Sequence, residues 1–121
     1  MYKQYTGIFF IASGVSVLNI KTSFDGGVLR LLFEGELDHH AAKKAAAVIE
    51  DSINIYLPKS CVIDFAKLAF MDSSGIAVIL KTYRRMNEIC GKISVENAGR
   101  QPLRVLDAAG IDRLIKISTE A

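Results

Sequence analysis

Two short polar segments contain the residues that could do chemistry in this chain. The segment Asp38–His40 places a carboxylate beside two imidazoles, which are groups that bind metal ions and transfer protons. The segment Asp72–Ser74 places a carboxylate beside two hydroxyls, which can attack a substrate or accept a phosphate. Each segment is open to a chemical interpretation and to a structural one.

The spacing of Asp38, His39 and His40 does not favour a metal site. Adjacent residues on a helix or strand point in different directions, so three consecutive side chains do not converge on one ion. The same three letters occur in the DHH phosphoesterases, but those chains are far longer and carry further Asp-containing motifs that this sequence lacks. We predict that Asp38 caps a helix and that both histidines lie in its exposed first turn.

The residues around Ser73 and Ser74 do not predict an enzyme. They lack the G-x-S-x-G elbow of hydrolases, and the chain has no phosphate-binding loop, so we expect no catalytic residue. One Asp is enough to cap a helix, and Asp72 therefore leaves the two hydroxyls as a surplus. We expect these hydroxyls to be accessible, and Gly75 to leave the backbone open to close approach by another molecule.

Phosphorylation is the chemical interpretation of this helix start, and plain capping is the alternative. A helix N-terminus favours an added anion by about 0.3 to 1 kcal/mol. A phosphoserine brings roughly 1.5 to 2 negative charges beside Asp72. We expect a phosphate to change which molecule docks there and to leave the domain folded.

The composition predicts one domain with a buried core. The chain has 121 residues, of which 50% are hydrophobic and 23% are charged. The net charge is +2 without a cluster of basic residues, so we expect no binding to nucleic acid. Cys61 and Cys90 are predicted to be small buried residues in a reducing compartment.

Residues 1–16 form an apolar N-terminal extension that we set apart from the domain. No residue from Gln4 to Ile20 is charged. As a helix, these residues would reach only about 25 Å, less than the hydrocarbon thickness of about 30 Å, so we do not expect a membrane span. They lack a suitable cleavage site for a secretory signal. An added strand, a flexible arm and a start codon chosen too early remain the alternatives.

The remaining residues alternate between strand and helix patterns. Val17–Lys21 and Val28–Glu34 predict a hairpin, and the unbroken apolar run Cys61–Phe65 predicts a central parallel strand. We expect helices from Asp38 to Pro58, from Asp72 to Gly91 and from Pro102 to Gly110, and further strands at Lys92–Asn97 and Leu114–Ile117. This order indicates an α/β fold in which helices pack on a mixed sheet.

Three segments together resemble one known family. Gly35–His40, Phe70–Ile76 and Leu106–Ile111 are similar to the STAS domain of bacterial anti-sigma factor antagonists, and most similar to the sporulation type. The family often has Gly-Leu-Gly where this chain has Gly75, Ile76 and Ala77. The resemblance implies a single STAS-like domain over 17–121, with a mixed sheet of four to five strands and three to four helices.

The resemblance also implies a cytoplasmic regulator of transcription. Unphosphorylated members of the family bind an anti-sigma factor that is also an ATP-dependent serine kinase, and so release the sigma factor. The kinase phosphorylates the residue corresponding to Ser73, with Ser74 as the minor alternative here, and a PPM-type serine phosphatase reverses the step. Nucleotide and metal belong to these partners, so we expect no cofactor in this chain. Membrane association is not expected.

The surface implied for the partner combines the two polar segments, because both follow strand ends at one edge of the sheet. The residues assigned to it are Asp38, His39, Asp72, Ser73, Ser74, Gly75 and Ile76. A second function remains open: the chain could be a non-catalytic STAS adaptor subunit of a stress-sensing or membrane-transport assembly. The apolar residues 1–16 favour that alternative.

Overall fold

The computed structural model describes residues 5, 7–13 and 16–119, and its elements follow the strand and helix patterns of the sequence. The strands are β1 (Gly7–Ser13), β2 (Ser16–Asp25), β3 (Val28–Leu37), β4 (Ser60–Met71), β5 (Lys92–Ala98) and β6 (Lys116–Thr119). The helices are α1 (His39–Tyr56), α2 (Ser73–Glu88) and α3 (Arg100–Ala108), followed by a 3₁₀ turn over Ile111–Arg113.

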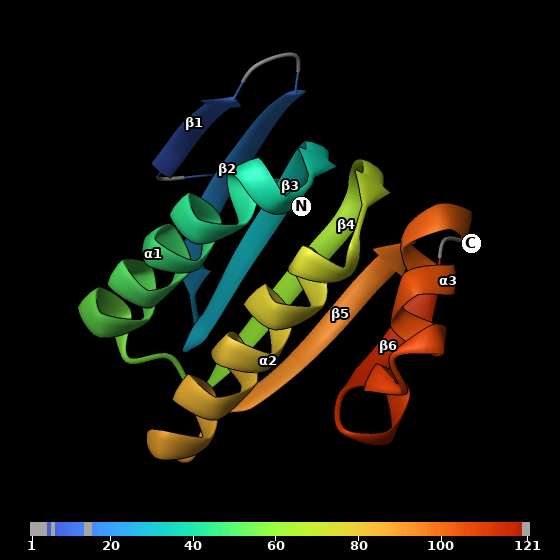
Figure 1. Cartoon of the computed structure of the whole chain (residues 1–121). Coiled ribbons are helices and arrows are strands. Elements are labelled where there is room, and N and C mark those ends of the chain that lie inside the picture. Colours follow the sequence, from blue (N-terminus) through green and yellow to red (C-terminus); the bar gives the residue numbers. More distant parts are fainter. Residues whose placement is uncertain (1–4, 6, 14–15, 120–121) are drawn as a thin grey trace.

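Within the described residues, six strands form one mixed sheet in chain order, from β1 at one edge to β6 at the other (Figure 1). The pairs β1–β2 and β2–β3 are antiparallel, and the pairs from β3 to β6 are parallel. The predicted hairpin is confirmed: Gly26 and Gly27 connect β2 to β3 with φ of +58° and +81°. Two positive φ angles are typical of a type I′ turn, which suits the twist of paired strands.

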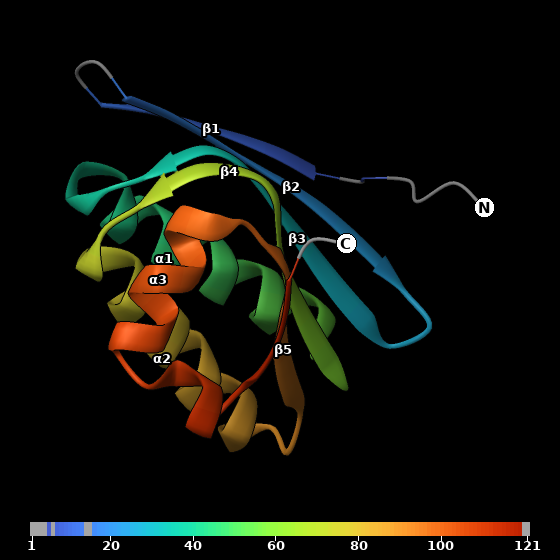
Figure 2. The same ribbon diagram turned by 90° about the vertical axis from the view of Figure 1, so that its right-hand side faces the viewer.

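The helices α1, α2 and α3 lie on one face of the sheet, as two perpendicular views show (Figures 1 and 2). Right-handed crossovers between successive parallel strands place them there. The core lies between the two layers and is fully buried at Leu29, Leu31, Ile63 and Val95, which come from three neighbouring strands. Every residue of Cys61–Phe65 is buried, so the prediction of a central strand is confirmed.

The opposite face of the sheet carries ion pairs. The Arg30 guanidinium lies 3.2 Å from a carboxylate oxygen of Asp64 and 3.0 Å from one of Glu96. Further along the same face, Lys21 pairs with Glu34 at 3.0 Å. These pairs join β2, β3, β4 and β5, and so hold the strands from the side that the helices leave uncovered.

Three expectations from the sequence need correction. The sheet of the described residues has six strands rather than four to five, because Gly7–Ser13 pairs with β2. The last strand is Lys116–Thr119 rather than Leu114–Ile117, because the chain is still turning at Ile115, whose N–H donates to the Ile111 carbonyl at 2.9 Å.

The third correction concerns the two cysteines. Cys61 is buried in β4, as predicted, and burial raises the pKa of its thiol to about 12. Cys90 is exposed just after α2, at φ of +59°, so the prediction that it is buried is wrong.

Candidate functional site

The starts of α1 and α2 lie side by side at one edge of the sheet. Strands β3 and β4 are parallel, and Leu37 is in register with Met71. Asp38 and Asp72 come directly after these two residues, and the Asp72 N–H donates to the Leu37 carbonyl at 3.3 Å. The structure thus brings together the two polar segments that the sequence analysis singled out.

Asp38 caps α1 with its carboxylate. Its Oδ1 atom accepts hydrogen bonds from the backbone N–H groups of His40 and Ala41, both at 3.0 Å. His39 and His40 are exposed, and their ring centroids are 3.8 Å apart. Among the residues that the structure describes, no group of three His, Cys, Asp or Glu side chains could hold a metal ion.

Asp72 caps α2 in the same way, and the two serines after it differ in exposure. The Asp72 Oδ1 atom accepts a hydrogen bond from the Ser74 N–H at 2.8 Å. Ser73 is exposed, whereas Ser74 is half-buried. Ser73 is the first residue of α2, so a group attached to its hydroxyl would stand at the N-terminal end of the helix.

Gly75 does not leave its backbone open, and that expectation is wrong. The residue is buried, and a Cβ atom placed on it would lie 2.6 Å from the Met71 sulfur and 3.1 Å from Leu37 Cδ2. Glycine is needed here because the first turn of α2 rests directly on the ends of β3 and β4. Gly75 therefore contributes to the site by letting the first turn of α2 pack closely on Met71 and Leu37.

A groove runs from Ser73 along the space between α2 and α3. Its volume is about 490 Å³, and its lining is mostly apolar. The lining residues are Ser73, Ile76, Gln101, Arg104, Val105, Ala108 and Ala109. The groove joins the exposed hydroxyl of Ser73 to an apolar surface of the kind that docks a partner protein.

The α3 side of this groove was missed by the sequence analysis. The available signal was the order of the elements: α3 comes after the parallel strand β5, so its start lies at the same edge as the starts of α1 and α2. Phe70, two residues before the capping Asp72, is 39% exposed, which the sequence analysis did not predict.

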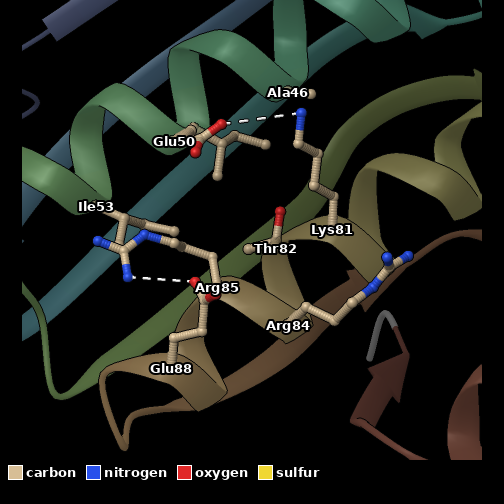
Figure 3. Close-up of a pocket in the computed structure, with 9 residues that line it drawn as sticks. Ala46, Glu50, Ile53, Lys81, Thr82, Arg84, Arg85 and Glu88 are labelled. Atoms are coloured by element: carbon tan, nitrogen blue, oxygen red, sulfur yellow. Dashed lines mark hydrogen bonds and ion pairs between the residues drawn. The ribbon is translucent and has the colours of Figure 1, made fainter.

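A separate hollow of about 210 Å³ lies between α1 and α2, away from the two helix starts (Figure 3). Lys81 on α2 pairs with Glu50 on α1 at 3.8 Å, and Arg85 contacts both Asn54 and Glu88. Arg84 points away from the other labelled side chains. The contacts of Lys81 with Glu50 and of Arg85 with Asn54 bridge α1 and α2, whereas Arg85 and Glu88 pair within α2.

No helix within the described part of the chain is both long enough and apolar enough to cross a membrane.

Comparison with known proteins gives a consistent result. The STAS domain family matches residues 19–120. An anti-sigma F factor antagonist of Paenibacillus polymyxa is 32% identical over 100 residues, which cover 83% of this chain and 86% of that protein. One of Lysinibacillus sphaericus is 30% identical over 93 residues, which cover 77% of this chain and 78% of that protein.

Solved structures agree with the sequence relatives. The unphosphorylated form of the anti-sigma factor antagonist SpoIIAA superposes with a TM-score of 0.72 at 25% identity, and covers 84% of this chain and 89% of that chain. The phosphorylated form of SpoIIAA, a cell fate determinant of Bacillus, superposes with a TM-score of 0.65 at 25% identity, and covers 84% and 92%.

Proposed function

The chain belongs to the STAS domain family, and we propose that it is an anti-sigma factor antagonist whose binding to its partner is controlled by phosphorylation of Ser73. The unphosphorylated form binds the anti-sigma factor and thereby frees a sigma factor. The phosphorylated form does not bind. The proposal assigns no catalysis to this chain.

The observation that carries the proposal is the exposure of Ser73 at the first position of α2, beside the apolar groove. A kinase can reach this hydroxyl without unfolding the domain. Ser74 is half-buried, and its N–H already bonds the capping carboxylate, which makes it the poorer acceptor. The similarity to SpoIIAA, which exists in a phosphorylated and an unphosphorylated form, supports control by phosphorylation.

The charge of a phosphate explains how one modification would switch binding. A phosphoserine at position 73 adds roughly 1.5 to 2 negative charges. The N-terminus of α2 tolerates an anion, so the fold is retained. A docked partner would have to bury that dianion at the rim of an apolar groove, which is costly unless a cation faces it.

The proposed partners supply the chemistry. The anti-sigma factor acts as a serine kinase that uses ATP, and a PPM-type phosphatase with its own metal ions restores the hydroxyl. Both proteins would act in the bacterial cytoplasm. We assign Asp38 and His39 to the second part of the contact surface, together with Asp72 and Ile76, because they follow the end of β3, which pairs with the end of β4 before Ser73.

The proposal is tested by incubating the purified chain with its cognate anti-sigma factor and ATP. We expect the mass to increase by one phosphate, and peptide sequencing to place it on Ser73. The Ser73→Ala variant should remain unmodified, while the matched Ser74→Ala variant should be phosphorylated like the parent. Phosphorylation should abolish binding to the anti-sigma factor in its ADP-bound state.

Two results would contradict the proposal. One is the absence of phosphate in the parent chain, and the other is a phosphate that leaves binding unchanged. Either result would favour the adaptor alternative, in which a STAS subunit holds an assembly together without a phosphate switch. The next experiment would then look for the partner of residues 1–16.

A further inference from the structure

One side chain from α3 holds the strand end that leads into α2. The Gln101 amide group donates from Nε2 to the Met71 carbonyl at 2.8 Å, and its Oε1 atom accepts from the Met71 N–H at 2.8 Å. The two residues are 30 positions apart in the chain. A side-chain amide that exchanges both bonds with one residue reproduces the pairing of two residues in a β-ladder.

This pairing replaces a missing strand neighbour. Strand β5 is in register with β4 only as far as the pair Asp64 and Glu96, although β4 continues to Met71. On the other side, β3 remains paired with β4 up to Leu37 and Met71, with two shifts of register on the way. Gln101 therefore bonds the last residue of β4 on the β5 side, where β4 no longer pairs with β5.

Met71 in turn supports the first turn of α2. Its side chain is fully buried and occupies the space that a Cβ atom on Gly75 would need. Asp72 and Ser73 come directly after it in the chain. A shift of Met71 would move the cap and the exposed hydroxyl of Ser73 together.

Gln101 also lines the groove that Ser73 opens. The same side chain thus connects α3, one side of the groove, to the end of β4 that leads into α2, the other side. Arg100, its neighbour on α3, is exposed, and no hydrogen bond or ion pair joins it to Met71 among the contacts of the described residues.

We propose that Gln101 is a positioning residue that fixes the start of α2, so that Ser73 and the α2–α3 groove are presented together to the partner. The effect of Gln101 on partner binding and phosphorylation rests on the proposed function. The positioning of Ser73 by Gln101 can be measured in the isolated chain, without a partner. Both a donor and an acceptor are needed at the end of the side chain, and at neutral pH the Gln101 amide supplies both, whereas an ionised carboxylate of the same length would only accept.

The first test measures positioning in the isolated full chain. Gln101→Met keeps the length of the side chain and removes both hydrogen bonds. We expect amide hydrogen exchange at Met71 to become about tenfold faster, with faster exchange also at Ser74, whose N–H depends on the Asp72 cap. Exchange at His40 and Ala41, in the start of α1, should stay within about twofold of the parent.

The second test uses charge and pH. Gln101→Glu keeps the acceptor but loses the donor, and it changes the net charge by the same amount as the control Arg100→Gln. We expect Gln101→Glu to shift the backbone NMR signals of Met71 to Ser74 at neutral pH. The signals should return toward those of the parent as the pH falls through about 4.3 and the protonated carboxyl donates again. Arg100→Gln should show neither change.

The third test measures the effect of Gln101 on partner binding and on Ser73 phosphorylation. Gln101→Met should weaken binding to the anti-sigma factor and lower the rate of Ser73 phosphorylation, each by about tenfold. If exchange accelerates equally at both helix starts, Gln101 supports the fold as a whole and the inference is wrong. If the parent itself neither binds nor accepts phosphate, the proposed function fails, while the exchange and pH experiments still decide whether Gln101 positions Ser73.

Discussion

The two helix starts share their backbone geometry and differ in the residues after the cap. Asp38 has φ of −102° and ψ of −176°, and Asp72 has φ of −106° and ψ of −172°. Each lies at the end of a parallel strand, and each caps its helix with a carboxylate oxygen. Both helix starts are therefore formed in the same way, by an Asp cap after a parallel strand. Their proposed roles differ because the residues around the caps differ.

The start of α1 is capped by local hydrogen bonds and ring contacts. The Asp38 carboxylate binds two N–H groups, the rings of His39 and His40 lie against each other, and the methyl group of Ala41 is buried. The hydrogen bonds of this cap run from Asp38 to the first turn of α1 itself.

The start of α2 depends on other elements. Its cap binds one N–H group, the position equivalent to Ala41 is a glycine because Met71 fills the space, and Gln101 of α3 holds Met71. Because Gln101 both bonds Met71 and lines the groove, a change at the start of α2 can be transmitted to the groove.

The largest expected difference between the two starts is in binding. Ser73→Glu and His39→Glu place a carboxylate at equivalent first positions. We expect Ser73→Glu to weaken the affinity for the anti-sigma factor about 100-fold, because it puts an unpaired charge at the apolar groove that the partner is proposed to cover. His39→Glu should cost less than about tenfold, as rim charges do. Isothermal titration calorimetry at fixed salt measures both.

The stability of the same variants is the control. An acidic residue in the first turn of a helix is favourable, so neither variant should lower the free energy of unfolding by more than about 0.5 kcal/mol. Equal losses of affinity at the two positions would show that the partner does not distinguish the start of α2 from the start of α1.

A second difference concerns packing. Gly75→Ala should lower the free energy of unfolding by about 1 to 3 kcal/mol, because the new methyl group meets Met71 and the Leu37 Cδ2 atom at 3.1 Å. The matched change at the other start, Ala41→Gly, removes a buried methyl group and should cost about 1 kcal/mol. Urea unfolding with an unchanged slope compares the two. A Gly75→Ala protein as stable as the parent would mean that Met71 moves aside at no cost.

The sequence predicted the two starts well because caps are local. An Asp before an amphipathic pattern satisfies the free N–H groups of a helix within a few residues, so Asp38 and Asp72 could be assigned from spacing alone. The edge at which they meet could be inferred from the parallel arrangement of β3 and β4.

The contacts that distinguish the two starts could not be predicted in the same way. The burial of Gly75 depends on the side chains of Leu37 and Met71, and the pairing of Gln101 with Met71 spans 30 positions. A polar residue at the exposed start of a helix gives no sign of a partner that distant. The last strand was misplaced because the N–H groups of Leu114 and Ile115 donate to the Ile111 carbonyl, which carries the turn into the β-rich run.

The smallest expected difference is in stability, between variants of the two capping residues. Replacing Asp by Asn removes the charge of the cap and keeps its hydrogen bonds. Asparagine caps a helix about as well as aspartate, so Asp38→Asn and Asp72→Asn should change the free energy of unfolding by only a few tenths of a kcal/mol, whereas replacement by alanine should cost about 1 kcal/mol. The loss should be larger for Asp38→Ala than for Asp72→Ala, because Asp38 accepts from two N–H groups and Asp72 from one.

The affinity of these variants for the anti-sigma factor separates the charge of each cap from its hydrogen bonds. If Asp38→Asn keeps the stability of the parent but binds the anti-sigma factor more weakly, the partner contacts the negative charge at the start of α1. If only Asp38→Ala weakens binding, the partner requires an ordered start of α1 and not the negative charge. Asp38 would then no longer be assigned to the contact surface. The same two variants at Asp72 tell whether the cap beside Ser73 contributes to binding through its charge or only by holding the phosphate acceptor in place.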